Sequence, residues 1–221
     1  MTPLIAIPVL MAGYLLGSIP SGYLAGRWLK GIDIRQEGSG STGATNVLRV
    51  VGKGPALAVF VVDVLKGALA VLLAKAVLAP LGQPPNPADW QIDGWIVLAG
   101  LAGLAGHIWP IWLGWKGGKA VATGLGMLLG VSWPVGLACF GIFLAVLSFS
   151  RIVSLSSMVA ALSLPLLMVG SFGSGGIRPA YLLLAVLTTV LVVWRHRSNI
   201  ERLWAGTEPK LGSKKPRPGA G

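Results

Sequence analysis

Seven long apolar runs cover most of this chain and limit what it can fold into. They lie at residues of about 3–26, 55–79, 93–113, 120–131, 133–149, 153–172 and 178–195. A helix needs about 20 apolar residues to cross a bilayer, so the run at 120–131 is too short to cross at full thickness. Charged residues make up 11% of the chain, whereas a soluble domain carries about 25%. We therefore predict an all-α, polytopic membrane protein with about seven transmembrane helices.

The positive charges predict how these helices are oriented. The loops on one side of the membrane and the C-terminal segment carry Arg27, Lys30, Arg35, Arg49, Lys53, Lys116, Lys119, Arg151, Arg195, Arg197, Arg202, Lys210, Lys214, Lys215 and Arg217. The loops on the other side carry only Arg178. Because cytoplasmic loops are enriched in Lys and Arg, we predict the N-terminus outside and the C-terminus in the cytoplasm. This orientation requires an odd number of spans, which is seven, or five if the short central runs are re-entrant.

The net charge of +11 also suits a nucleic-acid-binding protein, but the cations lie beside apolar spans. There they meet lipid headgroups or anionic substrates, so we predict a lipid bilayer as partner and no nucleic acid. Residues 1–205 form one predicted transmembrane domain. Residues 206–221 are rich in Pro, Gly and Lys and are predicted to be a basic, flexible cytoplasmic tail.

Several kinds of chemistry find no support in the sequence. Cys139 is the single cysteine and lies in an apolar run, which excludes a disulfide framework. Two histidines and seven acidic residues form no metal-ligand pattern, so we expect neither a metal nor another cofactor. No Gly-x-Ser-x-Gly segment occurs, and no serine has an evident His/Asp partner, so an acyl-enzyme mechanism is not expected.

The polar segment between the first two apolar runs is the most informative part of the chain. Residues 38–46 read Gly-Ser-Gly-Ser-Thr-Gly-Ala-Thr-Asn and precede two cations. Small residues let backbone N–H groups converge on an anion, and Arg and Lys supply charge. The segment is therefore either a phosphate-binding loop at the membrane surface or a polar connector. As a phosphate site it would use Ser39, Gly40, Ser41, Gly43, Asn46, Arg49 and Lys53.

Three further polar clusters fall on the same predicted side of the membrane. Lys116-Gly-Gly-Lys119 opens an apolar run and suits an anion at a helix N-terminus, although two snorkelling lysines would give the same pattern. Arg151 with Ser154 offers a weaker phosphate contact. His196 and Asn199 share a helical face, where a histidine within reach of a bound hydroxyl acts as base or positioner. The gathering of these clusters on one side favours a single assembled site.

Two polar positions lie within or at the end of predicted spans. Asp63 and Lys66 are three residues apart and share a helix face. Ionised residues inside a bilayer usually face the protein interior and find partners. The pair either reaches a substrate phosphate, with Lys66 as the binding member, or holds helices together. His107 lies beside Trp109 and Pro110 and is either catalytic or a hydrogen-bonded packing residue.

Taken in order, these motifs resemble the bacterial acyl-phosphate:glycerol-3-phosphate acyltransferases, integral membrane enzymes of phospholipid synthesis. The matching segments are Gly38-Ser-Gly-x-x-Gly-Ala-Thr-Asn46 with Arg49, Asp63-x-x-Lys66-Gly67, Gly106-His107-x-x-Pro110 leading to Lys116-Gly-Gly-Lys119-x-Val-Ala-Thr123, and His196-x-x-Asn199-Ile-x-Arg202-Leu with Gly206-Thr-Glu208. They extend from about residue 17 to about residue 212. The resemblance implies seven helices in the bacterial inner membrane, an outside N-terminus and an active site facing the cytoplasm.

The resemblance implies transfer of an acyl group from acyl phosphate to the 1-hydroxyl of sn-glycerol 3-phosphate, giving lysophosphatidic acid and inorganic phosphate. It implies functional roles for Ser39, Arg49, Lys116, Lys119, His196 and Asn199, with Ser154 matching more loosely. Two positions depart from the family pattern: Ser41 stands where the family usually has Asn, and Ala120 where it usually has Gly. Because alanine disfavours positive φ, we expect a less open loop beside Lys119.

Acyl phosphate is a mixed anhydride with a good leaving group, so direct transfer needs no covalent enzyme step. We expect cations to hold the two phosphates and the fatty chain to lie in an apolar groove between helices. The proton passes to His196 or to a substrate phosphate oxygen. The competing classes are a small-anion transporter, which predicts charged broken helices in both halves, and a non-catalytic scaffold. The sequence leaves chain-length preference and oligomeric state open.

Overall fold

The computed structural model describes residues 2–81, 90–171 and 178–212, and these residues are almost entirely helical. The α-helices are α1 (Thr2–Gly17), α2 (Ser21–Lys30), α3 (Ala44–Val50), α4 (Lys53–Leu78), α5 (Trp90–Ile108), α6 (Val121–Val131), α7 (Trp133–Ser150), α8 (Val153–Ser171), α9 (Pro179–Arg195) and α10 (Arg197–Trp204). Three short 3-10 turns lie between them, η1 (Ile34–Gln36), η2 (Ala79–Leu81) and η3 (Ile111–Leu113). The predicted all-α class is confirmed.

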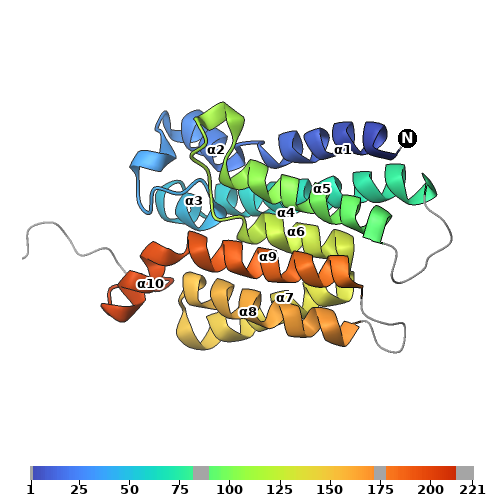
Figure 1. The fold of residues 1–221 in the computed structure, drawn as a ribbon. Helices are drawn as coiled ribbons and strands as arrows, with labels where there is room; N and C mark the ends of the chain where they lie inside the picture. Colours follow the sequence, from blue (N-terminus) through green and yellow to red (C-terminus); the bar gives the residue numbers. More distant parts are fainter. Residues whose placement is uncertain (1, 82–89, 172–177, 213–221) are drawn as a thin grey trace, which may run out of the picture.

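The long helices pack side by side in one bundle (Figure 1). Helices α1, α4 and α5 pack against one another, α8 packs against α7 and α9, and α6 packs against both α4 and α7. The short helices α2, α3 and α10 lie together at one end of the bundle, far from the N-terminus (Figure 1). The polar clusters singled out from the sequence are therefore brought to this end.

The helices account for most of the predicted spans. Five of them, with α1 and α2 counted together, are long and apolar enough to cross a membrane. Helices α9 and α10, bent by 57° at their junction, would make a sixth. The predicted shortness of the fourth apolar run is confirmed, since α6 has 11 residues. The first run is interrupted: α1 ends at Gly17 and α2 begins at Ser21, after Pro20, which lacks a backbone N–H.

Glycines allow α4 and α6 to pack in direct backbone contact. A Cβ added at Gly67 on α4 would overlap the backbone of Thr123, and one at Gly126 on α6 would overlap the backbone of Val64. Small residues permit such close approach of helices in a membrane protein. The contact fixes the first turn of α6, and the loop that precedes it, against the middle of α4.

The segment after α10 corrects one prediction. Residues 206–221 were expected to be a flexible tail, but Glu208 is buried and the Leu211 backbone N–H donates a hydrogen bond of 2.7 Å to the Arg151 carbonyl. Residues 206–212 are thus held at two points, because Glu208 accepts hydrogen bonds from Ser154, Asn199 and Arg202 and Leu211 is bonded to the loop before α8. Residues 213–221 lie outside the described part of the chain.

Candidate active site

A polar cavity of about 140 Å³ opens at the end of the bundle that carries α3 and α10. Nine of the residues predicted for the site line it, and they come from all four polar clusters: Ser39, Ser41, Gly43, Asn46, Arg49, Lys119, Ser154, His196 and Asn199. Asp63, His107 and Glu208 line it as well. The structure thus brings residues of all four clusters together around one cavity.

Asn46 organises the Gly/Ser/Thr loop. Its amide nitrogen donates to the carbonyl oxygens of Ile34, Glu37 and Ser41 at 2.9–3.1 Å, and its amide oxygen accepts from the Ser39 backbone N–H at 2.8 Å. The side chain is 1% exposed, and both of its polar atoms are hydrogen-bonded within the protein. Asn46 therefore shapes the loop around the cavity. The functional groups that the loop offers are those of its neighbours, chiefly Ser39 and Arg49.

The backbone of the Gly/Ser/Thr loop requires glycine at two positions. Gly38 and Gly40 have φ of +60° and +69°, where residues with a Cβ are disfavoured. A Cβ on Gly38 would also overlap the Asn46 amide oxygen. Gly40 does not itself line the cavity, and the structure shows it as a residue that turns the backbone.

The loop before α6 carries Lys119 into the cavity. Its backbone is tied to the end of α5, since the N–H of Gly117 donates to the Ile108 carbonyl at 3.0 Å and that of Gly118 donates to the His107 carbonyl at 3.1 Å. From the other side, the Arg195 guanidinium donates to the Gly118 carbonyl at 3.0 Å. The loop is therefore held by α5 and α9 together.

Ala120 corrects another expectation. Despite its Cβ, it adopts φ of +57°, the conformation expected of the glycine that the family usually has there. A left-handed conformation costs a non-glycine residue about 1–2 kcal/mol. The Ala120 carbonyl accepts the Gly124 N–H at 2.7 Å as the first bond of the α6 ladder, and the residue is buried. The surrounding packing thus imposes the glycine-like conformation, and alanine does not prevent a positive φ at this position.

The Lys119 ammonium is half-withdrawn from solvent and donates to the Asn199 amide oxygen. Burial and the nearby Arg202 guanidinium lower the pKa of Lys119 to about 8, although the Glu208 carboxylate acts in the opposite direction. Arg195 and Arg49 add to the lowering. This excess of positive charge in a small cavity favours an anionic ligand, which would relieve the repulsion between the cations.

Glu208 joins three parts of the site. Its Oε1 accepts from the Ser154 hydroxyl at 2.7 Å and from the Asn199 amide at 2.6 Å, and its Oε2 accepts from Arg202 Nε at 2.7 Å. Burial opposes the charged form, but these three hydrogen bonds lower the pKa of Glu208. The sequence placed Glu208 in the predicted tail and gave it no role in the site, although Gly206-Thr-Glu208 already matched the family pattern.

The His196 ring has a defined tautomer. Its Nδ1 lies 2.8 Å from the Val192 carbonyl oxygen, and a carbonyl can only accept a hydrogen bond. Nδ1 therefore carries the hydrogen, and the lone pair is on Nε2. Because His196 lines the cavity and is 2% exposed, this lone pair is the acceptor that a bound hydroxyl group would meet.

Three other predicted residues do not line the cavity. Lys53 and Lys116 are exposed and are not among the residues that line the cavity. Lys66 is buried, and its ammonium is engaged by Asp63 at 2.8 Å and by the Ile19 carbonyl at 2.9 Å. A direct phosphate contact by Lys66 is therefore not supported, because its charge is already paired. Of the two readings of this pair, the structure favours the one that holds helices together.

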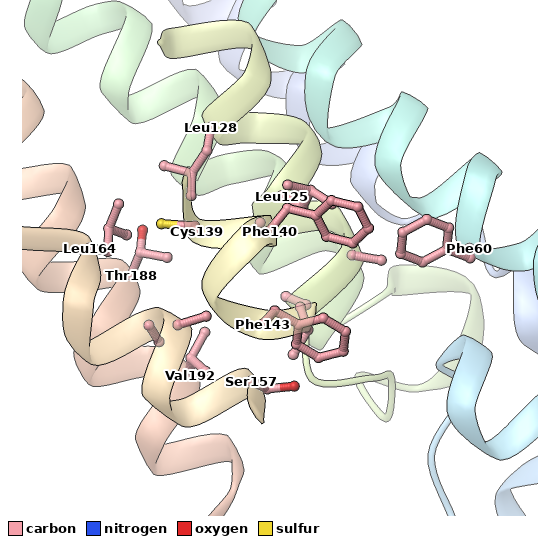
Figure 2. A pocket seen from close by; sticks show the side chains of 16 residues that line it. Phe60, Leu125, Leu128, Cys139, Phe140, Phe143, Ser157, Leu164, Thr188 and Val192 are labelled. Carbon is pink, nitrogen blue, oxygen red and sulfur yellow. The ribbon is translucent and has the colours of Figure 1, made fainter. Parts of the chain in front are cut away.

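An apolar cavity of about 90 Å³ adjoins the polar one. The two share the wall formed by Phe60, Ala120, Val121, Ala122, Phe143 and Ser157. Figure 2 shows Phe60 of α4 beside Phe140 and Phe143 of α7, with Leu128, Cys139 and Leu164 lining another part of the cavity. An amphipathic ligand can thus place its polar end among the cations and its apolar end between α6, α7, α8 and α9.

A family model described as "Glycerol-3-phosphate acyltransferase" matches residues 7–206. The chain belongs to the glycerol-3-phosphate acyltransferase family. A protein of this name from Parasynechococcus marenigrum (strain WH8102) is 66% identical over 212 residues, covering 96% of this chain and 92% of its own length. Another, from Prochlorococcus marinus (strain MIT 9313), is 70% identical over 203 residues, with coverage of 92% and 93%.

Two solved structures show that this acyltransferase fold is shared. The crystal structure of PlsY (YgiH), an integral membrane glycerol 3-phosphate acyltransferase, in its glycerol 3-phosphate form has a TM-score of 0.81 and 37% identity. It matches 94% of this chain and 96% of its own. The lysophosphatidic acid form of PlsY has a TM-score of 0.79 with the same identity. The resemblance stated from the motifs is confirmed, and so is the prediction of an integral membrane acyltransferase of phospholipid synthesis.

Proposed function

We propose that this acyltransferase uses acyl phosphate as donor and esterifies the 1-hydroxyl of sn-glycerol 3-phosphate, giving lysophosphatidic acid and inorganic phosphate. The observation that carries the proposal is the shared wall between a cationic cavity and an apolar one. Both substrates carry phosphate, and one also carries a fatty chain. A single opening that accepts both kinds of group suits this pair.

The cationic groups are proposed to hold the phosphates. Arg49 on α3 and Lys119 on the loop before α6 both line the cavity, and so do Val121 and Ala122 in the first turn of α6, where backbone N–H groups have no partner within the helix. Ser39 adds a hydroxyl from the Gly/Ser/Thr loop. His196 and Asn199 lie at the junction of α9 and α10 and position the glycerol phosphate. The acyl chain occupies the cavity lined by Phe60, Leu128 and Leu164 in Figure 2 and extends into the bilayer.

The reaction is direct displacement at the acyl carbon. The 1-hydroxyl oxygen of glycerol 3-phosphate bonds to the carbonyl carbon, the bond from that carbon to the phosphate oxygen breaks, and inorganic phosphate leaves with the electron pair. The hydroxyl proton passes to His196 Nε2 or to a phosphate oxygen of the substrates. Holding the hydroxyl against the carbonyl and stabilising the developing negative charge account for the acceleration, so no acyl-enzyme is needed.

The donor and acceptor are tested together with purified protein. We expect inorganic phosphate to be released from acyl phosphate only when glycerol 3-phosphate is present. Acyl-CoA and acyl-carrier-protein thioesters, tested in parallel, should give no lysophosphatidic acid. Phosphate release that does not depend on glycerol 3-phosphate would contradict the acyl transfer, and equal activity with a thioester would contradict the choice of donor.

The proton acceptor is tested at His196. If Nε2 is the base, His196→Ala lowers kcat at saturating substrates by about 100-fold or more. If the proton goes to a substrate phosphate, the same variant raises KM for glycerol 3-phosphate and changes kcat little. Asn199→Ala serves as the matched control, because Asn199 shares the positioning role of His196 but accepts no proton.

The proposed topology has seven helices, an outside N-terminus and the polar cavity at the cytoplasmic face, in line with the positive-inside distribution of charge. Cys139 is buried and is the one native cysteine, so replacing it with serine gives a background for single-cysteine labelling. With a thiol reagent that does not cross the membrane, Lys53→Cys, at the first residue of α4, should be labelled only after bacterial cells are permeabilised. Leu81→Cys, just beyond the other end of α4, should be labelled in intact cells.

A further inference from the structure

A buried polar cluster lies directly beneath the Lys119 loop and is not accounted for by substrate binding. It consists of the buried Asp63, Lys66, His107 and Thr123 and the partly buried Ser21, which come from four different helices. Asp63 Oδ1 accepts from the Ser21 hydroxyl at 2.7 Å and from Lys66 at 2.8 Å, and lies 3.6 Å from His107 Nδ1. A carboxylate would repel a substrate phosphate, so this cluster calls for a role other than direct binding.

The cluster reaches the loop through His107. His107 Nδ1 is 3.1 Å from the Thr123 hydroxyl, which fixes the ring plane between α4 and α6. Its other nitrogen, Nε2, lies so close to Gly118 that a Cβ there would overlap it. The His107 carbonyl accepts the Gly118 N–H at 3.1 Å. Both the ring and the backbone of His107 thus form the surface on which Gly118 rests.

Gly118 in turn determines where the next residue lies. Its N–H donates to the His107 carbonyl and its own carbonyl accepts from the Arg195 guanidinium, and Lys119 follows it directly. With no Cβ at Gly118, nothing separates the loop from the imidazole. A rotation of the His107 ring would therefore shift the Lys119 ammonium relative to Asn199 and the cavity.

We propose that Asp63 is a positioning residue of this enzyme: with Thr123 it fixes the His107 ring, which supports Gly118 and so places Lys119 for substrate binding. The proposal rests on the proposed function through the role it gives Lys119. Lys66 neutralises the Asp63 carboxylate within the span and takes no part in binding. Asp63 and His107 also line the cavity, but the role proposed for the cluster is to position the loop.

A double-mutant cycle tests the proposal. Asp63→Asn should lower kcat/KM by about tenfold through loss of positioning, mainly as a higher KM. In a Lys119→Ala background, the same change should lower kcat/KM by less than about twofold, because the group it positions is gone. If Asp63→Asn lowered kcat/KM by the same factor in both backgrounds, the proposal would be overturned, because Asp63 would then not act through Lys119.

Asp93→Asn is the matched control. Asp93 is ion-paired with Arg178 at 3.5 Å, away from the cavity, and should leave kcat/KM unchanged in both backgrounds. If Asp63→Asn does not fold because it leaves Lys66 unpaired, Thr123→Val decides instead. It removes the hydroxyl that holds the ring at nearly constant volume, and the same lack of additivity with Lys119→Ala is expected.

Backbone hydrogen exchange separates failure of this inference from failure of the proposed function. In detergent or nanodiscs, the Gly117 and Gly118 amides should exchange at least about tenfold faster in Thr123→Val than in wild type, and be unchanged in Asp93→Asn. This readout does not depend on substrate. Unchanged exchange in Thr123→Val would overturn the positioning role even in a fully active enzyme, and faster exchange would support it even if acyl phosphate proved to be the wrong donor.

Discussion

The two loops that meet at the polar cavity are built in different ways. The Gly/Ser/Thr loop is organised by Asn46, whose partners lie 5 to 12 residues away in the chain. The Lys119 loop also has two local backbone bonds, from Gly117 and Gly118 to the end of α5, but its other contacts are distant in sequence: Arg195 and Asn199 lie 77 and 80 residues from their partners in the loop. One loop is therefore shaped locally, and the other is shaped by the packing of α5, α9 and α10.

The difference has a chemical consequence. The first loop leads into α3, which carries Arg49, an exposed residue that lines the cavity and is proposed to bind phosphate there. The second presents Lys119, which is partly buried among other cations and has a lowered pKa. Local contacts are enough to place an arginine, which stays charged. A lysine whose pKa is lowered to about 8 also needs burial and neighbouring cations, and these come from the assembled bundle.

The largest effect is expected from removing the buried cation. Lys119→Ala should lower kcat/KM by about 100-fold or more, because a charged donor in a desolvated cavity is lost. Lys75→Ala is the matched control: Lys75 is also partly buried, but it donates to the Val131 carbonyl near the other end of α4. Steady-state kinetics in detergent micelles check both. A similar loss in the two variants would show that Lys119 acts through the fold and not through the substrate.

The locally built loop should depend on its central amide. Asn46→Ala removes three donated hydrogen bonds and one accepted one, and should lower kcat/KM by about tenfold or more through displacement of Ser39 and Arg49. The variant should lose about 2 kcal/mol of stability, seen as a lower Tm. Gln36→Ala, an exposed amide in the neighbouring turn, should change neither value. Wild-type kinetics for Asn46→Ala would contradict the organising role.

The titration of Lys119 distinguishes the two loops by pH. Below pH of about 8 the ammonium is charged and binds phosphate; above it the amine is neutral, so kcat/KM should fall about tenfold per pH unit. The second pKa of phosphate monoesters is about 6, so the charge of the substrate phosphates is constant around and above a pH of about 8. Lys119→Arg keeps its charge and should flatten the profile. The same alkaline fall in both proteins would assign it to another group.

The smallest effect is expected at Ala120. Ala120→Gly relieves a left-handed conformation worth about 1–2 kcal/mol but removes a buried methyl group worth about 0.8 kcal/mol and adds freedom to the unfolded chain. These terms nearly cancel, so Tm should change by a few degrees at most and kcat/KM by less than twofold. A large gain in activity would show that the present loop is misplaced, contrary to its glycine-like geometry.

Some of the site was predictable because its pattern is local. The composition of residues 38–46, the spacing of His196 and Asn199 and the short run at 120–131 all describe neighbouring residues, and each was recognised in the sequence. Other features were left open or misjudged for the opposite reason. Lys66 was interpreted as either a phosphate ligand or a residue that holds helices together, and its contacts with Asp63 and the Ile19 carbonyl favour the second. Glu208 was assigned to a flexible tail, but it accepts a hydrogen bond from Ser154.

The sequence by itself determined that this protein folds in a lipid bilayer and which chemical groups it has available, because hydropathy and residue type are properties of the chain alone. Only the tertiary structure decided which cations face the cavity, which one is buried enough to titrate near pH 8, and that an apolar cavity shares its wall with the polar one. Burial and electrostatic coupling act through space, so they depend on contacts between residues that the sequence places far apart.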